Sequence, residues 1–397
     1  MRELNAAALW AGLTAFVWYA CGGIPLQLSV AAQLGLTPAQ ASSSVFIVWT
    51  SGAVASIALS LRLRQPIPVT WTIPGLVYLG SLAGRFSVAE IAGGALVAAL
   101  ILAALAAGGV GARVMRWLPL PIVMGMFAGS ILDYLVRAVS ATVADLAVAG
   151  SVFGGYFAAR LAGSARVPPV GAALVLGAVA VALGYDGALP AVPWALPALA
   201  VPAFAFDPAA IAAVSLPLVV LAMGLGNVQG LGFVLGQGYA VPVDRVTRAV
   251  AAASIVNALF GGAPATVARN GAAILAAPDA GAPGGRYWAV VISSALTLVL
   301  ALAATPAASL LQALPKSFVV ALAGVALLSS MQDALEKAFG GAMRFGALTA
   351  FVVAVSPFSL LGITAAFWAL IAGVLASLVT ERAQLLSFWL TPVSMRE

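Results

Sequence analysis

Gln65-Pro-Ile-Pro-Val-Thr-Trp-Thr-Ile-Pro-Gly75 lies in one apolar part of the chain, and Gly261-Gly-Ala-Pro-Ala-Thr-Val-Ala-Arg-Asn-Gly271 lies in another. Both stretches carry prolines and glycines, which free backbone N–H and C=O groups that lipid cannot satisfy. Such groups are tolerated at membrane depth only against protein or a water-filled cavity. The two stretches therefore predict two broken helices that face one cavity. The alternative is that the prolines only kink helices for packing.

The two stretches occupy matching places in an internal repeat. Gly75 and Gly271 are 196 residues apart, as are Pro119 and Pro315, and this offset is close to half of the 397 residues. With seven spans in each half, the second half must enter the membrane from the opposite side. The result is an inverted-topology repeat, which is typical of secondary transporters.

The composition requires a membrane around the chain. Hydrophobic residues make up 63% of the sequence, charged residues only 8%, and the mean hydropathy is +1.11. Soluble domains carry about 25% charged residues. The basic residues are scattered between apolar segments, so the isoelectric point near 9.9 reflects topology rather than a nucleic-acid surface. We expect no nucleic-acid partner and a lipid bilayer as solvent.

The apolar segments predict an all-α polytopic protein with fourteen membrane segments, of which the third and tenth are the broken helices. With the N-terminus in the cytoplasm, 14 of the 18 Lys and Arg residues fall on the cytoplasmic side and three on the outer side, which supports both the count and the orientation. Both termini are then cytoplasmic, and a proline-rich connection at 185–207 is an ordered surface loop or short interfacial helices. The segments lie near 6–30, 40–60, 67–83, 88–108, 117–136, 145–162, 168–184, 209–236, 246–261, 264–277, 287–305, 311–331, 345–357 and 360–379.

The residue types exclude several chemistries. The chain has no histidine, and its one cysteine, Cys21, cannot form a disulfide within the chain. Imidazole metal sites and Ser-His catalysis are therefore excluded. The membrane segments show no nucleophile–base pair or carboxylate dyad, so we expect neither an enzyme nor a metal or cofactor.

Arg269 is the remaining basic residue, and it falls inside the tenth segment. An arginine within a membrane span is costly and usually functional. It lies near the N-terminus of a broken helix, where free N–H groups also favour an anion. We therefore predict an anion site between the N-termini of the third and tenth segments. The alternative is a structural salt bridge, with Asp133 or Glu90 as partner.

Other polar and aromatic residues of the spans complete this predicted site, although Asn and Gln can also serve only as hydrogen bonds between helices. Asp133 and Arg137 are expected to pair with each other, and Asp333 to lie at the headgroups. No acid occurs in the third, eighth or tenth segment, so we expect no titrating carboxylate at the site. The predicted substrate-binding residues are Arg269, Asn270, Thr266, Ala268, Asn227, Gln229, Gln27, Tyr19, Trp71, Thr72 and Ile73.

Several stretches resemble the benzoate/proton symporter family over nearly the whole chain. Val69-Thr-Trp-Thr-Ile-Pro-Gly75 resembles its Thr-Ala-Trp-Ser-Thr-Pro-Gly motif. Three further stretches are similar to the family: Asn227 to Gly230 with Gly238 to Pro242, Leu314-Pro with Ala321 to Leu328, and Leu361 to Gly373.

The resemblance implies the fold of nucleobase transporters and sulfate permeases, with 7+7 inverted repeats. It implies a core domain of residues 1–110 and 208–307 and a gate domain of residues 111–207 and 308–397. It also implies transport of an aromatic carboxylate with a proton, in a bacterial inner membrane, by a homodimer joined through the gate domain.

The sequence differs from these families at two positions. Benzoate transporters usually have an apolar residue where this chain has Arg269, and nucleobase transporters have a glutamate there. The acid that nucleobase transporters carry near Met223 is absent. The sequence thus predicts a secondary active transporter of an organic anion, most simply benzoate, working by an elevator-like movement. The alternatives are a small inorganic or dicarboxylate anion, as in sulfate permeases, or facilitated transport without protons.

Overall fold

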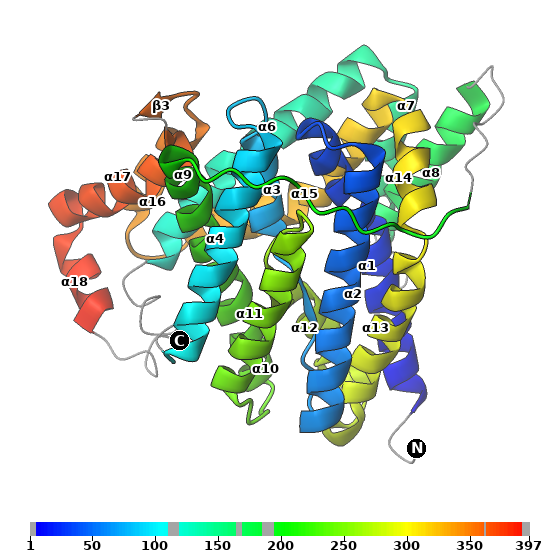
Figure 1. Ribbon diagram of the computed structural model, residues 1–397, viewed down its shortest axis with the longest axis horizontal. Coiled ribbons are helices and arrows are strands. Elements are labelled where there is room, and N and C mark those ends of the chain that lie inside the picture. The colour runs from blue at the N-terminus through cyan, green and yellow to red at the C-terminus, as the bar shows by residue number, and fades with distance from the viewer. Residues whose placement is uncertain (1–4, 110–118, 164–168, 185–193, 361–362, 391–397) are drawn as a thin grey trace.

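The computed structural model describes residues 5–109, 119–163, 169–184, 194–360 and 363–390. Within these residues the chain is a bundle of helices, with strands of only two or three residues (Figure 1). The elements of the first half are α1 (Ala6–Gln33), α2 (Pro38–Leu63), β1 (Val69–Trp71), α3 (Ile73–Ser81), α4 (Val88–Ala107), α6 (Leu120–Ala144), α7 (Val148–Ala162) and α8 (Pro169–Gly184).

The second half contains the same kinds of element, with one long helix interrupted by a π-helical segment, η2. Its elements are α9 (Pro208–Val220), η2 (Leu221–Asn227), α10 (Val228–Gly236), α11 (Val243–Leu259), β2 (Ala265–Val267), α12 (Arg269–Leu275), η3 (Pro278–Ala280), η4 (Pro283–Gly285), α13 (Tyr287–Ala301), α14 (Ala304–Ala313), α15 (Lys316–Phe339), α16 (Arg344–Val355), β3 (Ser359–Leu360), β4 (Ile363–Thr364), α17 (Ala365–Thr380) and α18 (Arg382–Leu390).

The two predicted broken helices are confirmed, and each consists of a short strand followed by a short helix. Strand β1 pairs antiparallel with β2, and Thr70 lies opposite Thr266. The offset of 196 that relates Gly75 to Gly271 also relates these two threonines. The local two-fold relation between the halves therefore passes through this pair, as an inverted repeat requires. Helix α3 packs against α1 and α6, and α12 packs against α1 and α10.

The backbone groups beyond the strand pair are satisfied in a matching way. The Thr72 N–H donates to the Pro264 carbonyl and the Ala268 N–H donates to the Pro68 carbonyl, both at 2.8 Å. At the outer edge of β1, the Ser56 hydroxyl accepts from the Val69 N–H at 2.7 Å. Ser254 does the same for Ala265 at 2.9 Å. These bonds replace the water that the middle of a membrane lacks.

The helices pack in two groups. In the first, α13 packs against α1 and α2, α4 packs against α9 and α11, both broken helices pack against α1, and α12 also packs against α10. In the second, α6 packs against α15 and α16, α7 against α8, and α16 against α17. The core and gate boundaries that the sequence implied, residues 1–110 with 208–307 and residues 111–207 with 308–397, stay a prediction.

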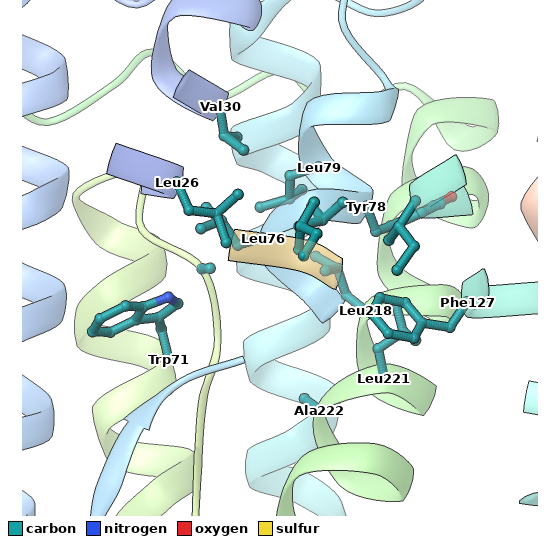
Figure 2. Packing of buried hydrophobic residues seen from close by; sticks show 14 of the residues in the cluster. Leu26, Val30, Trp71, Leu76, Tyr78, Leu79, Phe127, Leu218, Leu221 and Ala222 are labelled. Atoms are coloured by element: carbon teal, nitrogen blue, oxygen red, sulfur yellow. The ribbon is translucent and has the colours of Figure 1, made fainter. Parts of the chain in front are cut away.

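Apolar packing is dense around α3, between the two groups. Figure 2 shows Leu26 of α1, Phe127 of α6 and Leu218 of α9 gathered around Leu76 and Leu79 of α3. Each of these side chains is less than 10% exposed. In a lipid environment such contacts stabilise through close packing rather than through release of water.

Seven helices of the described residues are long and apolar enough to cross a membrane, or eight if the bent pair α17 and α18 forms one span. Large apolar side chains lie exposed on the helices, among them Leu161, Leu183 and Val379, each at least 84% exposed. Such surfaces suit lipid rather than water. The chain is therefore a multi-pass membrane protein, and the count of fourteen segments stays a prediction.

The predicted ordered surface loop is confirmed for residues 194–207, which cross α2 and α4 in extended conformation (Figure 1). The Ala200 N–H donates to the Ser43 hydroxyl at 2.8 Å, and the Ala205 N–H to the Ala89 carbonyl at 2.9 Å. The remainder of the predicted loop, residues 185–193, lies outside the described residues. So do the two ends of the chain, residues 1–4 and 391–397, which were predicted to be cytoplasmic.

The topology can be tested with single cysteines in a Cys21→Ser background. Gly284→Cys, in the exposed turn before α13, should react with a membrane-impermeant maleimide only from the cytoplasmic side. Lys316→Cys, at the start of α15, should react only from the outer side. Reaction of both cysteines from the same side would contradict the membrane crossing predicted between them.

Candidate functional site

A cavity of about 290 Å³ lies where the strand pair meets the two helix groups. The first group contributes α1, both broken helices and α10, and the second contributes α6, α8 and α15. Nine of the eleven predicted substrate-binding residues line this cavity, namely Tyr19, Trp71, Thr72, Ile73, Gln229, Thr266, Ala268, Arg269 and Asn270. The predicted site is thus one place in the structure, and two residues, Gln27 and Asn227, lie outside its lining.

Arg269 is the first residue of α12 and its guanidinium contacts α15. The Arg269 Nη1 donates to the Asp333 Oδ1 at 2.7 Å, and the two side chains are 38% and 30% exposed. The Lys337 Nζ donates to the Asp333 Oδ2 at 2.8 Å and to the Gln229 Oε1 at 3.0 Å. Three ionic side chains from the two helix groups therefore meet at the cavity.

This arrangement corrects three expectations. Asp333 lies at the cavity rather than at the headgroups, and it is the partner of Arg269. Asp133 instead pairs with Arg137 at 2.6 Å, as predicted, and Glu90 caps its own helix through Ser87. The expectation of no titrating carboxylate at the site overlooked Asp333, because it considered only the segments near the broken helices and α15 approaches from the other group.

The ends of the two short helices differ although their positions match. The Thr72 hydroxyl accepts from the Gly75 N–H at 3.2 Å and so caps α3. The matching residue before α12 is Ala268, which makes no side-chain cap. The start of α12 therefore has no side-chain cap beside Arg269, whereas Thr72 satisfies one N–H at the start of α3.

Three residues of the cavity wall each carry a buried polar atom that has no hydrogen-bond partner among the described residues. They are the Tyr19 hydroxyl, the Trp71 indole N–H and the Gln229 amide nitrogen. All three can donate a hydrogen bond. Buried polar groups nearly always find a partner, so these three atoms are exceptions in the wall of the cavity.

Tyr19 reaches the start of α12 because Gly271 has no side chain. A Cβ at position 271 would lie 1.6 Å from the Tyr19 hydroxyl oxygen. Tyr19 also packs edge-on against Trp18, with ring centroids 5.6 Å apart, and both rings line the cavity. The glycine thus places an unpartnered hydroxyl next to Arg269 and Asn270.

Gln27 acts one layer behind the cavity. Its Oε1 accepts from the Trp49 indole N–H, and Trp49 stacks on Trp71 with ring centroids 5.1 Å apart. The prediction that Gln27 contacts substrate is therefore not supported by its position. Gln27 instead fixes Trp49, and Trp49 supports the tryptophan that forms the cavity wall.

Asn227 likewise supports the cavity from behind and does not line it. It ends the π-helical segment η2, and its Oδ1 accepts from the Val267 N–H of β2 at 2.9 Å. The bond satisfies a strand group that would otherwise be buried without a partner. Asn227 is 4% exposed and lies behind β2 rather than in the cavity lining.

Sequence reasoning missed the wall contributed by the second group. It consists of Met124 and Phe127 on α6 and of Ser329, Ser330 and Asp333 on α15. A signal for the α15 part was present, because Ser330, Asp333 and Lys337 recur at helical spacing toward the end of this segment. A polar stripe of this kind within a span indicates a face turned toward a cavity.

Solved structures with this fold are membrane transporters. The chain matches the transmembrane domain of the cyanobacterial bicarbonate transporter BicA with a TM-score of 0.59 and 17% identity, covering 93% of this chain and 97% of that one. It matches the murine anion transporter Slc26a9 in its inward-facing state with a TM-score of 0.62 and 13% identity, over 97% and 69%. At these identities the likeness establishes the fold alone, that of a membrane transporter.

The family follows from the sequence matches. The benzoate membrane transport protein family matches residues 2–379, so the chain belongs to this family. It is 29% identical to the inner membrane protein YdcO of Escherichia coli, covering 88% of this chain and 90% of that protein. It is 25% identical to the benzoate membrane transport protein of Acinetobacter baylyi, over 94% and 95%.

The close approach of Tyr19 to α12 can be tested by size. Gly271→Ala should destabilise the protein by about 1–3 kcal/mol through overpacking, seen as a lower melting temperature. Adding Tyr19→Phe removes the clashing oxygen and should recover part of the loss. Gly284→Ala, where nothing lies within 4 Å, is the matched control. A melting temperature unchanged by Gly271→Ala would show that the ring does not lie there.

Proposed function

We propose that the protein is a secondary active transporter of an organic anion, most simply benzoate or a similar aromatic carboxylate. One observation carries this proposal. Arg269 lines a cavity whose wall also holds four aromatic rings, those of Trp18, Tyr19, Trp71 and Phe127. A carboxylate with an attached ring matches both halves of that lining. Membership of the benzoate family supports the same substrate class.

The carboxylate end of the substrate would lie at the start of α12. There it can accept from the Arg269 fork and from the free N–H groups that Ala268 leaves uncapped. The Asn270 amide and the Thr266 hydroxyl line the same part of the cavity. A planar guanidinium holds a carboxylate by two parallel hydrogen bonds, which fixes its orientation as well as its charge.

The ring of the substrate would lie between Trp71 and Tyr19 on one side and Phe127 on the other. Trp71 and Tyr19 belong to the first helix group and Phe127 to the second. Aromatic pairs favour offset or edge-on contacts and contribute about 0.5–1.5 kcal/mol beyond simple burial. The two groups would thus hold one substrate from both sides.

We propose that transport follows an elevator-like shift of the first group against the second, with the core and gate domains as predicted from the sequence. A site lined by both groups is suited to this movement, since the partial exposure of Arg269 and Asp333 leaves it open at one end. We further propose an inner-membrane location, cytoplasmic termini and a homodimer joined through the gate. No chemical step on the substrate is proposed.

The coupled ion is proposed to be a proton. The resemblance to benzoate/proton symporters and membership of the benzoate membrane transport family support this proposal. A pH indicator trapped inside vesicles of purified protein would report proton entry together with benzoate. Benzoate entry without proton entry would instead support the alternative of facilitated transport.

A small inorganic or dicarboxylate anion is the second candidate substrate. The fold likeness to a bicarbonate transporter favours it. Trp71→Leu separates the candidates, because it removes a ring wall and leaves the charge of Arg269. We expect this variant to weaken benzoate binding roughly tenfold and to leave bicarbonate or sulfate binding unchanged. Tight bicarbonate or sulfate binding by the wild type, with no benzoate binding, would select the second candidate.

Arg269 provides the main test of the anion site. Arg269→Ala should weaken benzoate binding roughly ten- to a hundredfold, because it removes a charge-assisted hydrogen bond. Arg269→Lys keeps the charge without the fork and should fall between the variant and the wild type. Titration calorimetry of purified protein measures both.

The matched control for this test is Arg248→Ala, which removes an equal charge from an exposed position on α11. It should leave benzoate affinity within about twofold of the wild type. Normal benzoate binding by Arg269→Ala would mean that Arg269 is only a structural partner of Asp333.

A further inference from the structure

The guanidinium proposed to hold the substrate already holds a carboxylate. The Asp333 Oδ1 accepts from Arg269 at 2.7 Å and its Oδ2 accepts from Lys337 at 2.8 Å. One carboxylate thus lies between two cations. A substrate carboxylate would be stabilised by the same charge-assisted hydrogen bonds. Asp333 is therefore paired with the guanidinium that the substrate carboxylate is proposed to bind.

The ion pair also joins the two helix groups. Arg269 belongs to α12 in the first group, and Asp333 belongs to α15 in the second. Lys337, one turn along α15, reaches back to the Gln229 Oε1 of α10 at 3.0 Å. An anion that replaces Asp333 on Arg269 therefore breaks a bond between the groups, while Asp333 keeps Lys337 as a partner.

No other charged group competes for Asp333 among the residues that the structure describes around it. On its own helix, Glu336 is exposed and accepts from Gln332 at 2.7 Å. The cavity residues contributed by α1, α6, α8 and α10 are uncharged, including Tyr19, Phe127 and Gln229. The Arg269 guanidinium can therefore pair either with Asp333 or with an anion from solution.

We propose that Asp333 is a built-in competitor for the anion site and sets its specificity. This inference rests on the proposed function. In the empty protein Asp333 neutralises Arg269 and ties α12 to α15. A substrate carboxylate displaces Asp333, which keeps its bond to Lys337. A neutral molecule of the same shape cannot make this exchange, because displacing Asp333 would leave Arg269 without a counter-charge.

The first test is removal of the competitor. Asp333→Asn should strengthen benzoate binding roughly tenfold, since Arg269 no longer has to be released. The same substitution in an Arg269→Ala background should have no effect, because there is nothing left to compete for. Glu336→Gln removes the same charge one turn away and should stay within about twofold of the wild type. Calorimetric titration of the full-length protein with benzoate compares five proteins: the wild type, the two single variants Asp333→Asn and Arg269→Ala, their double variant, and Glu336→Gln.

A second variant should act in the opposite direction. Lys337→Gln deprives Asp333 of its alternative partner, so Asp333 should hold Arg269 more firmly and benzoate binding should weaken about threefold or more. In an Asp333→Asn background, Lys337→Gln should lose most of this effect. This cycle keeps the inference testable if Asp333→Asn alone does not fold.

The outcomes separate this inference from the proposed function. Suppose that the wild type binds benzoate and that Arg269→Ala loses binding. If Asp333→Asn then binds no more tightly than the wild type, the proposal that Asp333 competes with substrate is overturned, and the proposed transport function stands. If Lys337→Gln strengthens binding, the competitor is again overturned. If the wild type binds no benzoate, the proposed function itself fails and the inference fails with it.

Discussion

Hydrogen bonding of the backbone in the middle of the membrane is the constraint on which this structure depends. Two stretches leave the helical conformation at membrane depth, where no water is present to satisfy N–H and C=O groups. The protein solves this by pairing β1 with β2 and by adding hydroxyls from Ser56 and Ser254 at the outer edges. The cavity exists because this pairing holds two short helices with their starts near one point. The positions of Arg269 and Trp71 follow from the same pairing.

The sequence predicted this part of the fold well because local chemistry determines it. Prolines and glycines mark where helices break, and the shared offset of 196 places the two breaks against each other. Thr72, Thr266 and Arg269 therefore line one cavity as expected. Residue type alone could not separate substrate contacts from supports. Gln27 and Asn227 are polar and buried, but their side chains accept hydrogen bonds from the Trp49 indole N–H and the Val267 backbone N–H instead of lining the cavity.

Asp333 shows why the rest of the site was beyond sequence reasoning. It lies 64 residues from Arg269, on a helix of the other group, and its distance from the end of α15 is compatible with a position at the headgroups. Only the packing of α15 across the cavity brings it to Arg269. The polar stripe through Ser330, Asp333 and Lys337 carried this information, but a stripe indicates a face and not the partner of that face. A single sequence shows the helical periodicity of polar residues, but it does not show which helix that polar face packs against.

The two-fold relation through Thr70 and Thr266 has a consequence for how such a site can evolve. Residues on the axis meet their own equivalents, whereas residues off the axis are free to differ. Thr72 and Ile73 are matched by Ala268 and Arg269, so one half supplies a closed, neutral helix end and the other an open, charged one. Two identical halves would offer the cavity either no arginine or a pair of arginines that repel each other. Fusing both halves into one chain permits a single cation beside a symmetric scaffold, and the binding chemistry resides in that departure from symmetry.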